Sequence, residues 1–297
     1  MTLTTDPVVC RRKEEVRRYL GERRRQGQRI GVVPTMGALH EGHVALARAL
    51  RQHCDFLAMW IFVNPTQFND PVDYERYPRT LQRDCKVAGE AGVELIFAPE
   101  VEEIYPAGLD AYRPGLSVRV RAGDRSLRYE GEHRPGHFDG VIHVCTVMFN
   151  ILQPDVVAFG EKDFQQVSVI RQLLVDLSLP IELITVPIVR GEGGLALSSR
   201  NKLLHDEGPA TAIWHSLQHA CARAEGGETS VQTLATEVSQ RLLAAGLRPE
   251  YVAIVDPDTL QPLERLAGEA RLLVAAFADN NVRLIDNIAI RGRVIEA

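Results

Sequence analysis

Pro34-Thr35-Met36-Gly37-Ala38-Leu39-His40-Glu41-Gly42-His43 is the stretch of sequence that decides the fold of this chain. The run before it, Ile30-Gly31-Val32-Val33, is apolar and partly β-branched, which is typical of a buried strand. The run after it, from Val44 to Leu50, is rich in good helix formers. We therefore predict a strand that passes through a glycine turn into the N-terminus of a helix.

The predicted turn has the composition of an anion-binding site. Free backbone N–H groups and the positive end of the helix dipole favour an anion there, and Gly37 and Gly42 lack the Cβ that would keep a phosphate or an adenine ring away. His40 and His43 are three residues apart, so both rings project to one side of a helical turn. Two alternatives are ordinary structural histidines and a zinc site, but the latter lacks the His-Glu-x-x-His spacing and a third ligand nearby. The pattern favours nucleotide phosphate chemistry.

Strand-like and helical patterns alternate along the first part of the chain. Apolar runs fall at Ile30 to Val33, Phe56 to Val63, Glu94 to Ala98, Val156 to Phe159 and Ile181 to Val186, with helical patterns near 43–52, 79–91, 140–152 and 164–177. This alternation predicts an α/β fold with a mostly parallel sheet covered on both faces, and ligands beyond the carboxyl ends of its strands. The histidine turn, Asn64 to Phe68 and Gly160 to Asp163 each follow such an end.

The pattern changes after Pro187. Arg190-Gly191-Glu192-Gly193-Gly194 is a candidate for a flexible hinge. Two helical stretches follow at 206–224 and 230–245, and three short strands are expected at Tyr251 to Val255, Arg271 to Phe277 and Val282 to Ile288. We therefore predict two domains, residues 1–188 and a smaller α+β domain of residues 189–297.

Composition excludes several classes of protein. The 297 residues are 45% hydrophobic and 25% charged, an ordinary balance for a soluble globular chain, and the net charge of −5 gives no basic face for nucleic acid. The arginines between Arg11 and Arg25 alternate with glutamates and predict the solvated face of a first helix. The longest apolar run, Phe56 to Val63, is too short to span a bilayer, and no signal peptide is evident, so we expect a cytoplasmic protein. Five scattered cysteines without a Cys-x-x-Cys pair predict reduced thiols.

Two further segments could bind phosphate. Lys162 follows a strand end and can place an ammonium group against a phosphate, although a lone Lys-Asp pair at a helix start is more often a cap and a surface charge. Ser198, Ser199 and Arg200 suit phosphate oxygens, but the same residues also make a plain helix cap and turn. Gly191-x-Gly193-x-x-Ala196 fits the dinucleotide fingerprint only superficially, because no hydrophobic helix opens on it.

Taken together, these motifs resemble the pantothenate synthetase (pantoate–β-alanine ligase) family. The resemblance covers nearly the whole chain, and His40-x-x-His43 and Leu197 to Arg200 are also similar to signatures of the wider nucleotidylyltransferase superfamily. It implies a Rossmann-like N-terminal domain, a C-terminal lid domain, a homodimer, and ATP with Mg²⁺. The chain departs from the usual family pattern at Gly193, where an acidic residue is common, and at Leu197, where Met is common. Gly193 is expected to loosen the hinge.

The resemblance also implies roles for individual residues. The pantoate carboxylate would attack the α-phosphorus of ATP, and β-alanine would then attack the pantoyl adenylate and release AMP. The implied catalytic residues are His40, His43, Lys162 and Arg200, with His43 the better candidate for a proton donor. The implied pantoate and β-alanine site contains Asn64, Gln67 and Gln166. The implied ATP-binding residues are Met36, Gly37, Ala38, Leu39, His40, Glu41, Gly42, His43, Gly160, Glu161, Lys162, Asp163, Val189, Leu197, Ser198, Ser199 and Arg200.

Three alternatives remain open at this stage. The chain could be an adenylyltransferase that passes AMP to a phosphate acceptor, a non-catalytic nucleotide-binding module, or a relative that charges tRNA. The acidic balance and the lack of an anticodon-binding extension argue against the last. The presence of both histidines together with Lys162, Ser198, Ser199 and Arg200 argues against a non-catalytic nucleotide-binding module, which would not need all of these phosphate ligands.

Overall fold

The chain forms two compact units in the computed structural model, which describes residues 6–110, 113–115 and 118–292. The first unit contains residues up to Glu161 together with Val169–Pro187. The second contains Lys162–Ser168 together with the residues from Ile188 onward. Each unit has a hydrophobic core of its own.

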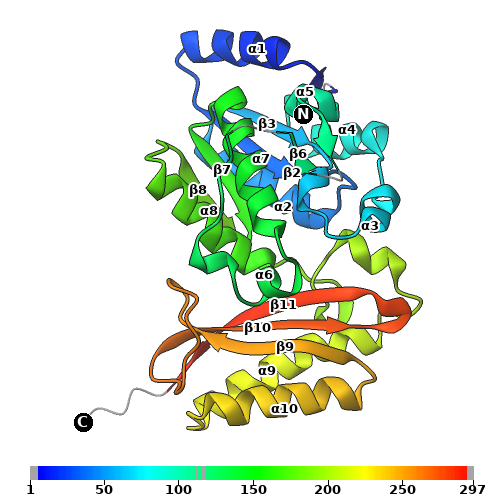
Figure 1. Ribbon diagram of the computed structural model, residues 1–297, viewed down its shortest axis with the longest axis vertical. Coiled ribbons are helices and arrows are strands. Elements are labelled where there is room, and N and C mark those ends of the chain that lie inside the picture. Colours follow the sequence, from blue (N-terminus) through cyan, green and yellow to red (C-terminus); the bar gives the residue numbers. More distant parts are fainter. Residues whose placement is uncertain (1–5, 111–112, 116–117, 293–297) are drawn as a thin grey trace. The chain divides into compact units, whose positions relative to one another are not determined.

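A six-stranded parallel sheet forms the centre of the first unit (Figure 1). The strand order is β1-β4-β3-β2-β7-β8. From β2 the chain builds the sheet outward through β3 and β4, and it later returns to place β7 on the other side of β2. Ligands of open α/β sheets bind beyond the carboxyl ends of the strands at such a switch point. The strands are β1 (Val8–Cys10), β2 (Ile30–Thr35), β3 (Phe56–Ile61), β4 (Leu95–Phe97), β7 (Val156–Gly160) and β8 (Glu182–Val186).

Helices cover both faces of this sheet because its buried strands are apolar on both sides. Leu57 and Met59 of β3 share a core cluster with residues of α2 and α4. On the opposite face, the Trp60 ring lies 5.9 Å from that of Phe149 on α7. Alternate residues of one strand therefore contact different helix layers, as the period of two requires. The helices are α1 (Lys13–Arg25), α2 (Glu41–Leu50), α3 (Pro71–Arg76), α4 (Leu81–Glu90), α5 (Val101–Ile104), α6 (Glu130–His133), α7 (His137–Leu152) and α8 (Phe164–Asp176), and β5 (Leu109–Asp110) pairs with β6 (Arg113–Pro114).

The second unit is a small antiparallel sheet covered by two helices (Figure 1). Its strands β9 (Arg248–Val255), β10 (Glu269–Phe277) and β11 (Arg283–Arg291) have the order β11-β10-β9. Helices α9 (Ala212–Glu225) and α10 (Val231–Ala244) pack against each other and against this sheet. Leu217, Leu234 and Leu272 lie fully buried between the two layers.

The predicted parallel sheet and the α+β character of the C-terminal part are confirmed. The helix expected over 206–224 begins only at Ala212, because Pro209–Thr211 first forms a 3-10 turn. The hinge expected at Arg190 to Gly194 is a hydrogen-bonded turn, in which Gly191 N donates to the Leu195 carbonyl oxygen at 2.9 Å. Gly194 has a φ of 87°, and a Cβ there would lie 1.9 Å from Trp214 Cδ1. Its lack of a side chain permits close packing in a tight turn.

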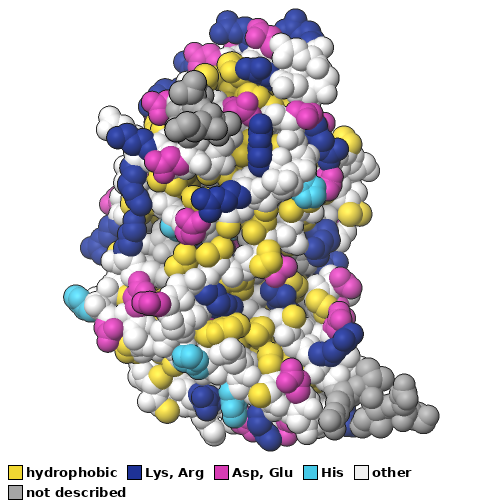
Figure 2. Space-filling view, turned by 180° about the vertical axis from the view of Figure 1, so that it is seen from behind, with side chains coloured by type: hydrophobic (Ala, Val, Ile, Leu, Met, Phe, Trp, Pro, Cys, Tyr) yellow, Lys and Arg dark blue, Asp and Glu magenta, His cyan; other side chains and the backbone are white. Residues whose placement is uncertain are grey.

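The face of the molecule shown in Figure 2 carries charges of both signs, and burial keeps the cysteine thiols protonated. Lys and Arg side chains are interspersed with Asp and Glu side chains over the face shown in Figure 2. The five cysteines are free thiols, and burial raises the pKa of each of them. Thiols of this kind stay protonated near neutral pH and react slowly. Among the described residues, no helix is both long and apolar enough to cross a membrane.

Replacing Leu272 by Ala is expected to destabilise the second unit. Leu272 on β10 is fully buried, so truncation leaves a cavity that lowers the free energy of unfolding by about 2–5 kcal/mol. The matched control is Leu243→Ala on α10, where the side chain is 59% exposed and a change within about 0.5 kcal/mol is expected. Urea unfolding followed by circular dichroism measures both, and equal losses in the two variants would contradict the packing of β10.

Candidate active site

Three predicted motifs leave the parallel sheet at the same edge. The histidine turn follows β2, the loop Asn64–Phe68 follows β3, and Gly160 ends β7. Because β2 pairs in parallel with both β3 and β7, the carboxyl ends of these strands lie side by side. This edge contains the switch point of the sheet, where a ligand crevice is expected.

The turn between β2 and α2 requires glycine at position 37. Gly37 has a φ of 83° and Ala38 has a φ of 52°. Such left-handed conformations cost free energy for residues with a Cβ. A Cβ on Gly37 would also lie 3.1 Å from both Asp84 Oδ2 and Ile61 Cγ2. The strained path through Ala38 therefore persists only because surrounding contacts hold it.

One buried carboxylate supplies those contacts. Asp84 lies on α4 and is 1% exposed. It accepts hydrogen bonds from Ala38 N at 3.0 Å and from Leu39 N at 2.9 Å, and the Thr80 hydroxyl lies 3.1 Å from each of its oxygens. A buried donor that loses its acceptor costs about 1–3 kcal/mol. Asp84 therefore fixes the path of the chain between β2 and α2.

Four further backbone donors of the turn are also occupied by the protein. Gly37 N donates to Thr35 Oγ1 at 3.2 Å, and His40 N donates to His43 Nδ1 at 3.3 Å. At the start of α2, Gly42 N donates to His40 Nδ1 at 3.1 Å, and His43 N donates to the His40 carbonyl oxygen at 2.8 Å. The expectation that the backbone N–H groups of this turn are free to bind an anion is therefore wrong for these donors, because Thr35, His40, His43 and the buried Asp84 of α4 accept from them.

Hydrogen bonds at Nδ1 define the tautomer of both histidine rings. Their centroids lie 4.2 Å apart, and both residues are half-buried. A backbone N–H can only donate, so each Nδ1 atom accepts and carries no proton. In the neutral ring the proton then lies on Nε2. His40 and His43 therefore each provide an Nε2–H group, a donor suited to a phosphate oxygen.

The loop after β3 is built around the Asn64 amide, which is 1% exposed. Its Nδ2 donates to the Gly140 carbonyl oxygen at 3.2 Å and to Gln67 Oε1 at 3.0 Å. Its Oδ1 accepts from the hydroxyl groups of Tyr105 at 2.7 Å and Thr66 at 2.9 Å. A carbonyl oxygen can only accept, so the Gly140 contact identifies the nitrogen end of the Asn64 amide. The hydrogen-bonding capacity of Asn64 is thus used within the protein, by Thr66 and Gln67 of the loop and by Tyr105 and Gly140 outside it.

Gln67 takes its orientation from Asn64. Its Oε1 accepts from Asn64, so its Nε2 points elsewhere and lies 3.0 Å from Met36 Sδ. A thioether sulfur is a weak acceptor, which a substrate oxygen can replace. Since Met36 belongs to the histidine turn, this contact also joins the two motifs. Gln67 therefore presents an N–H donor beside that turn.

Helix α7 packs directly on the backbone of the same loop. A Cβ on Gly140 would lie 2.3 Å from the Thr66 carbonyl oxygen, so a side chain there would displace the loop. The Gln67 carbonyl oxygen lies 2.8 Å from His137 Nδ1 and 3.3 Å from Arg134 Nη2. Because a carbonyl oxygen only accepts, His137 Nδ1 is the donor. The loop is therefore held through its backbone as well as through Asn64.

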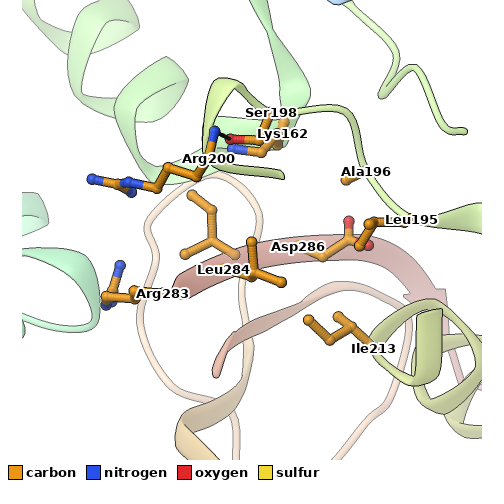
Figure 3. A pocket seen from close by; sticks show the side chains of 10 residues that line it. Lys162, Leu195, Ala196, Ser198, Arg200, Ile213, Arg283, Leu284 and Asp286 are labelled. Atoms are coloured by element: carbon orange, nitrogen blue, oxygen red, sulfur yellow. Dashed lines mark hydrogen bonds between the residues drawn. The ribbon is translucent and has the colours of Figure 1, made fainter. Parts of the chain in front are cut away.

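In the second unit, Lys162, Ser198 and Arg200 line one pocket, together with Arg283 (Figure 3). Ser198 caps the 3-10 helix Ser199–Leu203, and its Oγ accepts a hydrogen bond from Arg200 N at 3.3 Å. Ammonium, guanidinium and hydroxyl groups gathered in one pocket suit the oxygens of a phosphate chain. The structure thus brings together residues from three distant segments of the sequence, within a single unit.

Polar residues of β11 hold the segments that supply this pocket. Asn287 Nδ2 donates to the Lys162 carbonyl oxygen at 2.9 Å, and Asn287 Oδ1 accepts from Arg271 Nε at 2.6 Å. The neighbouring Asp286 forms a two-pronged ion pair with Arg190, with N–O distances of 2.6 and 3.0 Å. Bidentate pairs of this kind fix geometry as well as charge. The position of Lys162 therefore depends on the antiparallel sheet.

The predicted residues fall into two groups, one in each unit. Met36 to His43, Asn64 and Gln67 belong to the first unit, which also contains Gly160 and Glu161. The second contains Lys162, Asp163, Gln166, Val189, Leu197, Ser198, Ser199 and Arg200. Leu197 N donates to the Val189 carbonyl oxygen at 2.9 Å, which places those two side by side. The two predicted pantoate ligands, Gln67 and Gln166, lie in different units.

Sequence reasoning missed the residues that hold the site in place. They are Asp84, Tyr105, His137, Gly140, Arg190, Asp286 and Asn287. Each acts on a segment far away in the chain; Asp84, for example, binds a turn 46 residues before it. In the sequence, Thr80 and Asp84 read as an ordinary helix start, so no local signal distinguishes them.

Comparison with known proteins agrees with this arrangement. The family model described as pantoate-beta-alanine ligase matches residues 8–289. A pantothenate synthetase of Moorella thermoacetica is 47% identical over 278 residues, which cover 93% of this chain and 95% of the relative. One from Marinobacter nauticus is 46% identical over 279 residues, covering 93% of this chain and 97% of the relative.

Solved structures agree in fold over almost the full length. Pantothenate synthetase from Thermus thermophilus gives a TM-score of 0.86 at 41% identity, covering 95% of this chain and 98% of that one. The pantoate–β-alanine ligase from Francisella tularensis, solved in complex with β,γ-ATP and β-alanine, gives 0.78 at 33% identity, covering 95% and 97%. On the match of family model, sequence and fold, the chain belongs to the pantoate–β-alanine ligase family.

Proposed function

We propose that this chain condenses pantoate with β-alanine to pantothenate and consumes ATP, with pantoyl adenylate as the intermediate. As a member of its family it is a ligase of this type. The residue assignment rests on the hydrogen bonds at Nδ1 of His40 and His43, which put the proton of each neutral ring on Nε2, and on the amide donor that Gln67 directs toward Met36 of the same turn. These groups match the two partners of an adenylation step, a phosphate chain and a carboxylate.

The chemistry requires no protein nucleophile. The pantoate carboxylate attacks the α-phosphorus of ATP in line, and the bond to pyrophosphate breaks. The β-alanine amine then attacks the acyl carbon of the adenylate, loses a proton to solvent and releases AMP. Negative charge builds on phosphate oxygens in the first step, so catalysis depends on positioning and on preorganised donors.

We assign His40 and His43 to the triphosphate as neutral hydrogen-bond donors. Their Nδ1 atoms are occupied by backbone N–H groups, and protonation there would remove the cap of α2. Donation from Nε2–H therefore fits the geometry better than delivery of a proton from a charged ring. We therefore propose that His43 donates a hydrogen bond to the phosphate, in place of the expected transfer of a proton.

The remaining residues divide between the substrates. Gln67 donates to an acceptor oxygen of pantoate, with Gln166 as a second ligand and Asn64 as the residue that orients Gln67. Lys162 and Arg200, with the two serines, are assigned to the β and γ phosphates. The adenosine pocket is assigned to Gly160, Glu161, Asp163, Val189 and Leu197, and to the main chain of the histidine turn.

Mg²⁺ is the metal that the family resemblance implies. Among the residues that the structure describes, no group of three or more His, Cys, Asp or Glu side chains is placed to hold a metal ion. Mg²⁺ usually keeps several waters and is bound largely through substrate phosphates. The donor set therefore fits an ion that enters with the nucleotide as MgATP and neutralises phosphate charge.

We also propose that the enzyme is a homodimer in the cytoplasm. The homodimer rests on the family resemblance and is open to sedimentation velocity, whereas the location is the expectation drawn from the sequence. A monomer at working concentration would remove the dimer from this account without affecting the assignment of the reaction.

The reaction is tested by product analysis with the purified chain, ATP and Mg²⁺. ATP–pyrophosphate exchange is expected to depend on pantoate, because only adenylation of the acid returns pyrophosphate to ATP. AMP release is expected to require β-alanine as well. Exchange supported equally well by phosphopantetheine would favour an adenylyltransferase that acts on a phosphate acceptor and would overturn the proposal.

The role of His43 is tested by two substitutions that differ in one donor. His43→Ala removes the ring, and pantoate-dependent exchange is expected to fall about 10²-fold or more, as when one preorganised donor is lost. His43→Gln keeps an amide donor near the position of Nε2, and we expect at least about a tenth of wild-type exchange. If both variants were equally inactive while still folded, the neutral-donor assignment would fail in favour of proton transfer.

A further inference from the structure

We infer that Tyr105 is a positioning residue for pantoate, because its hydroxyl group fixes the Asn64 amide and, through it, the direction in which Gln67 donates. This inference rests on the proposed function. The polar contacts of the Tyr105 hydroxyl group are with the loop after β3, at Asn64 and Thr66. Its sequence context gave it no role.

The Tyr105 hydroxyl group makes the shortest hydrogen bond to the Asn64 amide. Its oxygen lies 2.7 Å from Asn64 Oδ1 and 3.2 Å from Thr66 Oγ1, whereas the Thr66 hydroxyl lies 2.9 Å and Thr66 N lies 3.4 Å from Asn64 Oδ1. Because Asn64 Oδ1 can only accept, the Tyr105 O–H must be the donor in the 2.7 Å contact. Tyr105 therefore stabilises one of the two possible orientations of this amide.

The surroundings of Tyr105 keep that donor in place. The side chain is fully buried, and burial raises the pKa of its phenol, so the O–H keeps its proton at any pH at which the protein works. Its ring lies 6.0 Å from the His143 ring in a stacked arrangement and 6.3 Å from the Phe62 ring. Rings on two sides leave the phenol little freedom to turn.

The orientation of Asn64 determines what Gln67 offers to a ligand. With Oδ1 toward Tyr105, Asn64 turns its Nδ2 toward Gln67 Oε1 at 3.0 Å. Gln67 then has its N–H donors available on the side of Met36. If the Asn64 amide turned over, Gln67 would have to turn over too, and it would present a carbonyl oxygen to the acidic substrate. Two hydrogen-bond acceptors, the Gln67 carbonyl oxygen and a carboxylate oxygen of pantoate, would then face each other, and pantoate would bind more weakly.

Tyr105→Phe tests this relay with little change in packing. The ring contacts remain, and only the O–H group is lost. The Kd of pantoate, measured by calorimetry, and the KM for pantoate are expected to rise about tenfold, the size of effect usual for one lost hydrogen bond. The KM for ATP is expected to stay within about twofold, since no phosphate ligand is touched. The matched control is Tyr19→Phe, which removes a hydroxyl that contacts Arg23 on α1, and no change in pantoate affinity is expected.

A double-mutant cycle separates positioning from a general structural effect. If Tyr105 acts through Asn64, then Tyr105→Phe should cause no further loss of pantoate affinity in an Asn64→Ala background. The inference would be overturned if the losses of pantoate affinity in the two single variants multiplied in the double variant. It would also be overturned if Tyr105→Phe raised the KM values for pantoate and ATP equally. Wild-type pantoate affinity in Tyr105→Phe would overturn it as well.

A second variant tests the same orientation if Tyr105→Phe does not fold. Asn64→Asp places an oxygen where Nδ2 now faces Gln67 Oε1 and the Gly140 carbonyl oxygen, so Gln67 is expected to turn over and pantoate affinity to fall at least tenfold. Unchanged affinity would overturn the relay. A wild-type chain that does not bind pantoate at all would instead overturn the proposed function, so the two failures are distinguishable.

Discussion

The structure of the site depends on the hydrogen bonds that the buried Asp84 carboxylate accepts from Ala38 N and Leu39 N. The turn they hold carries a non-glycine residue with a positive φ, which is unfavourable without such support. The turn determines the N-terminal cap of α2, the placement of both imidazoles and the position of Met36 beside Gln67. The buried Asp84 side chain on α4 thus holds the turn from which we propose that two neutral imidazole donors act.

Much of the fold could be predicted from local patterns. The apolar runs that became β2, β3 and β7 are continuous because helices cover both faces of the sheet, and the glycine-rich junction after β2 gave the first helix turn with its two histidines. The three-residue edge strand β1 was missed, since Val8-Val9-Cys10 is too short to show a period. The alternation of strands and helices predicts a parallel sheet, but it does not predict that β7 lies beside β2.

The sequence predicts candidate ligand-binding residues but not the residues that hold them in place. The candidate ligand-binding residues lie in compact motifs after strand ends. Asp84, Tyr105 and Asn287 instead contact residues far away in the sequence, and no local sequence pattern indicates such contacts. The sequence also suggested that free backbone N–H groups would bind the anion. That failed because the side chains of Thr35, His40, His43 and Asp84 satisfy them, an outcome that depends on tertiary contacts and on the direction in which each ring points.

We propose that this turn, held by surrounding side chains, offers two imidazole Nε2–H donors to the phosphates of ATP. A crystal structure of the enzyme with pantoate, Mg²⁺ and a non-hydrolysable ATP analogue tests this arrangement. Phosphate oxygens are expected about 2.7–3.2 Å from the Nε2 atoms of His40 and His43, with both Nδ1 atoms still bound to the backbone. A triphosphate held away from both rings, or rings turned so that Nδ1 faces the nucleotide, would contradict the proposal.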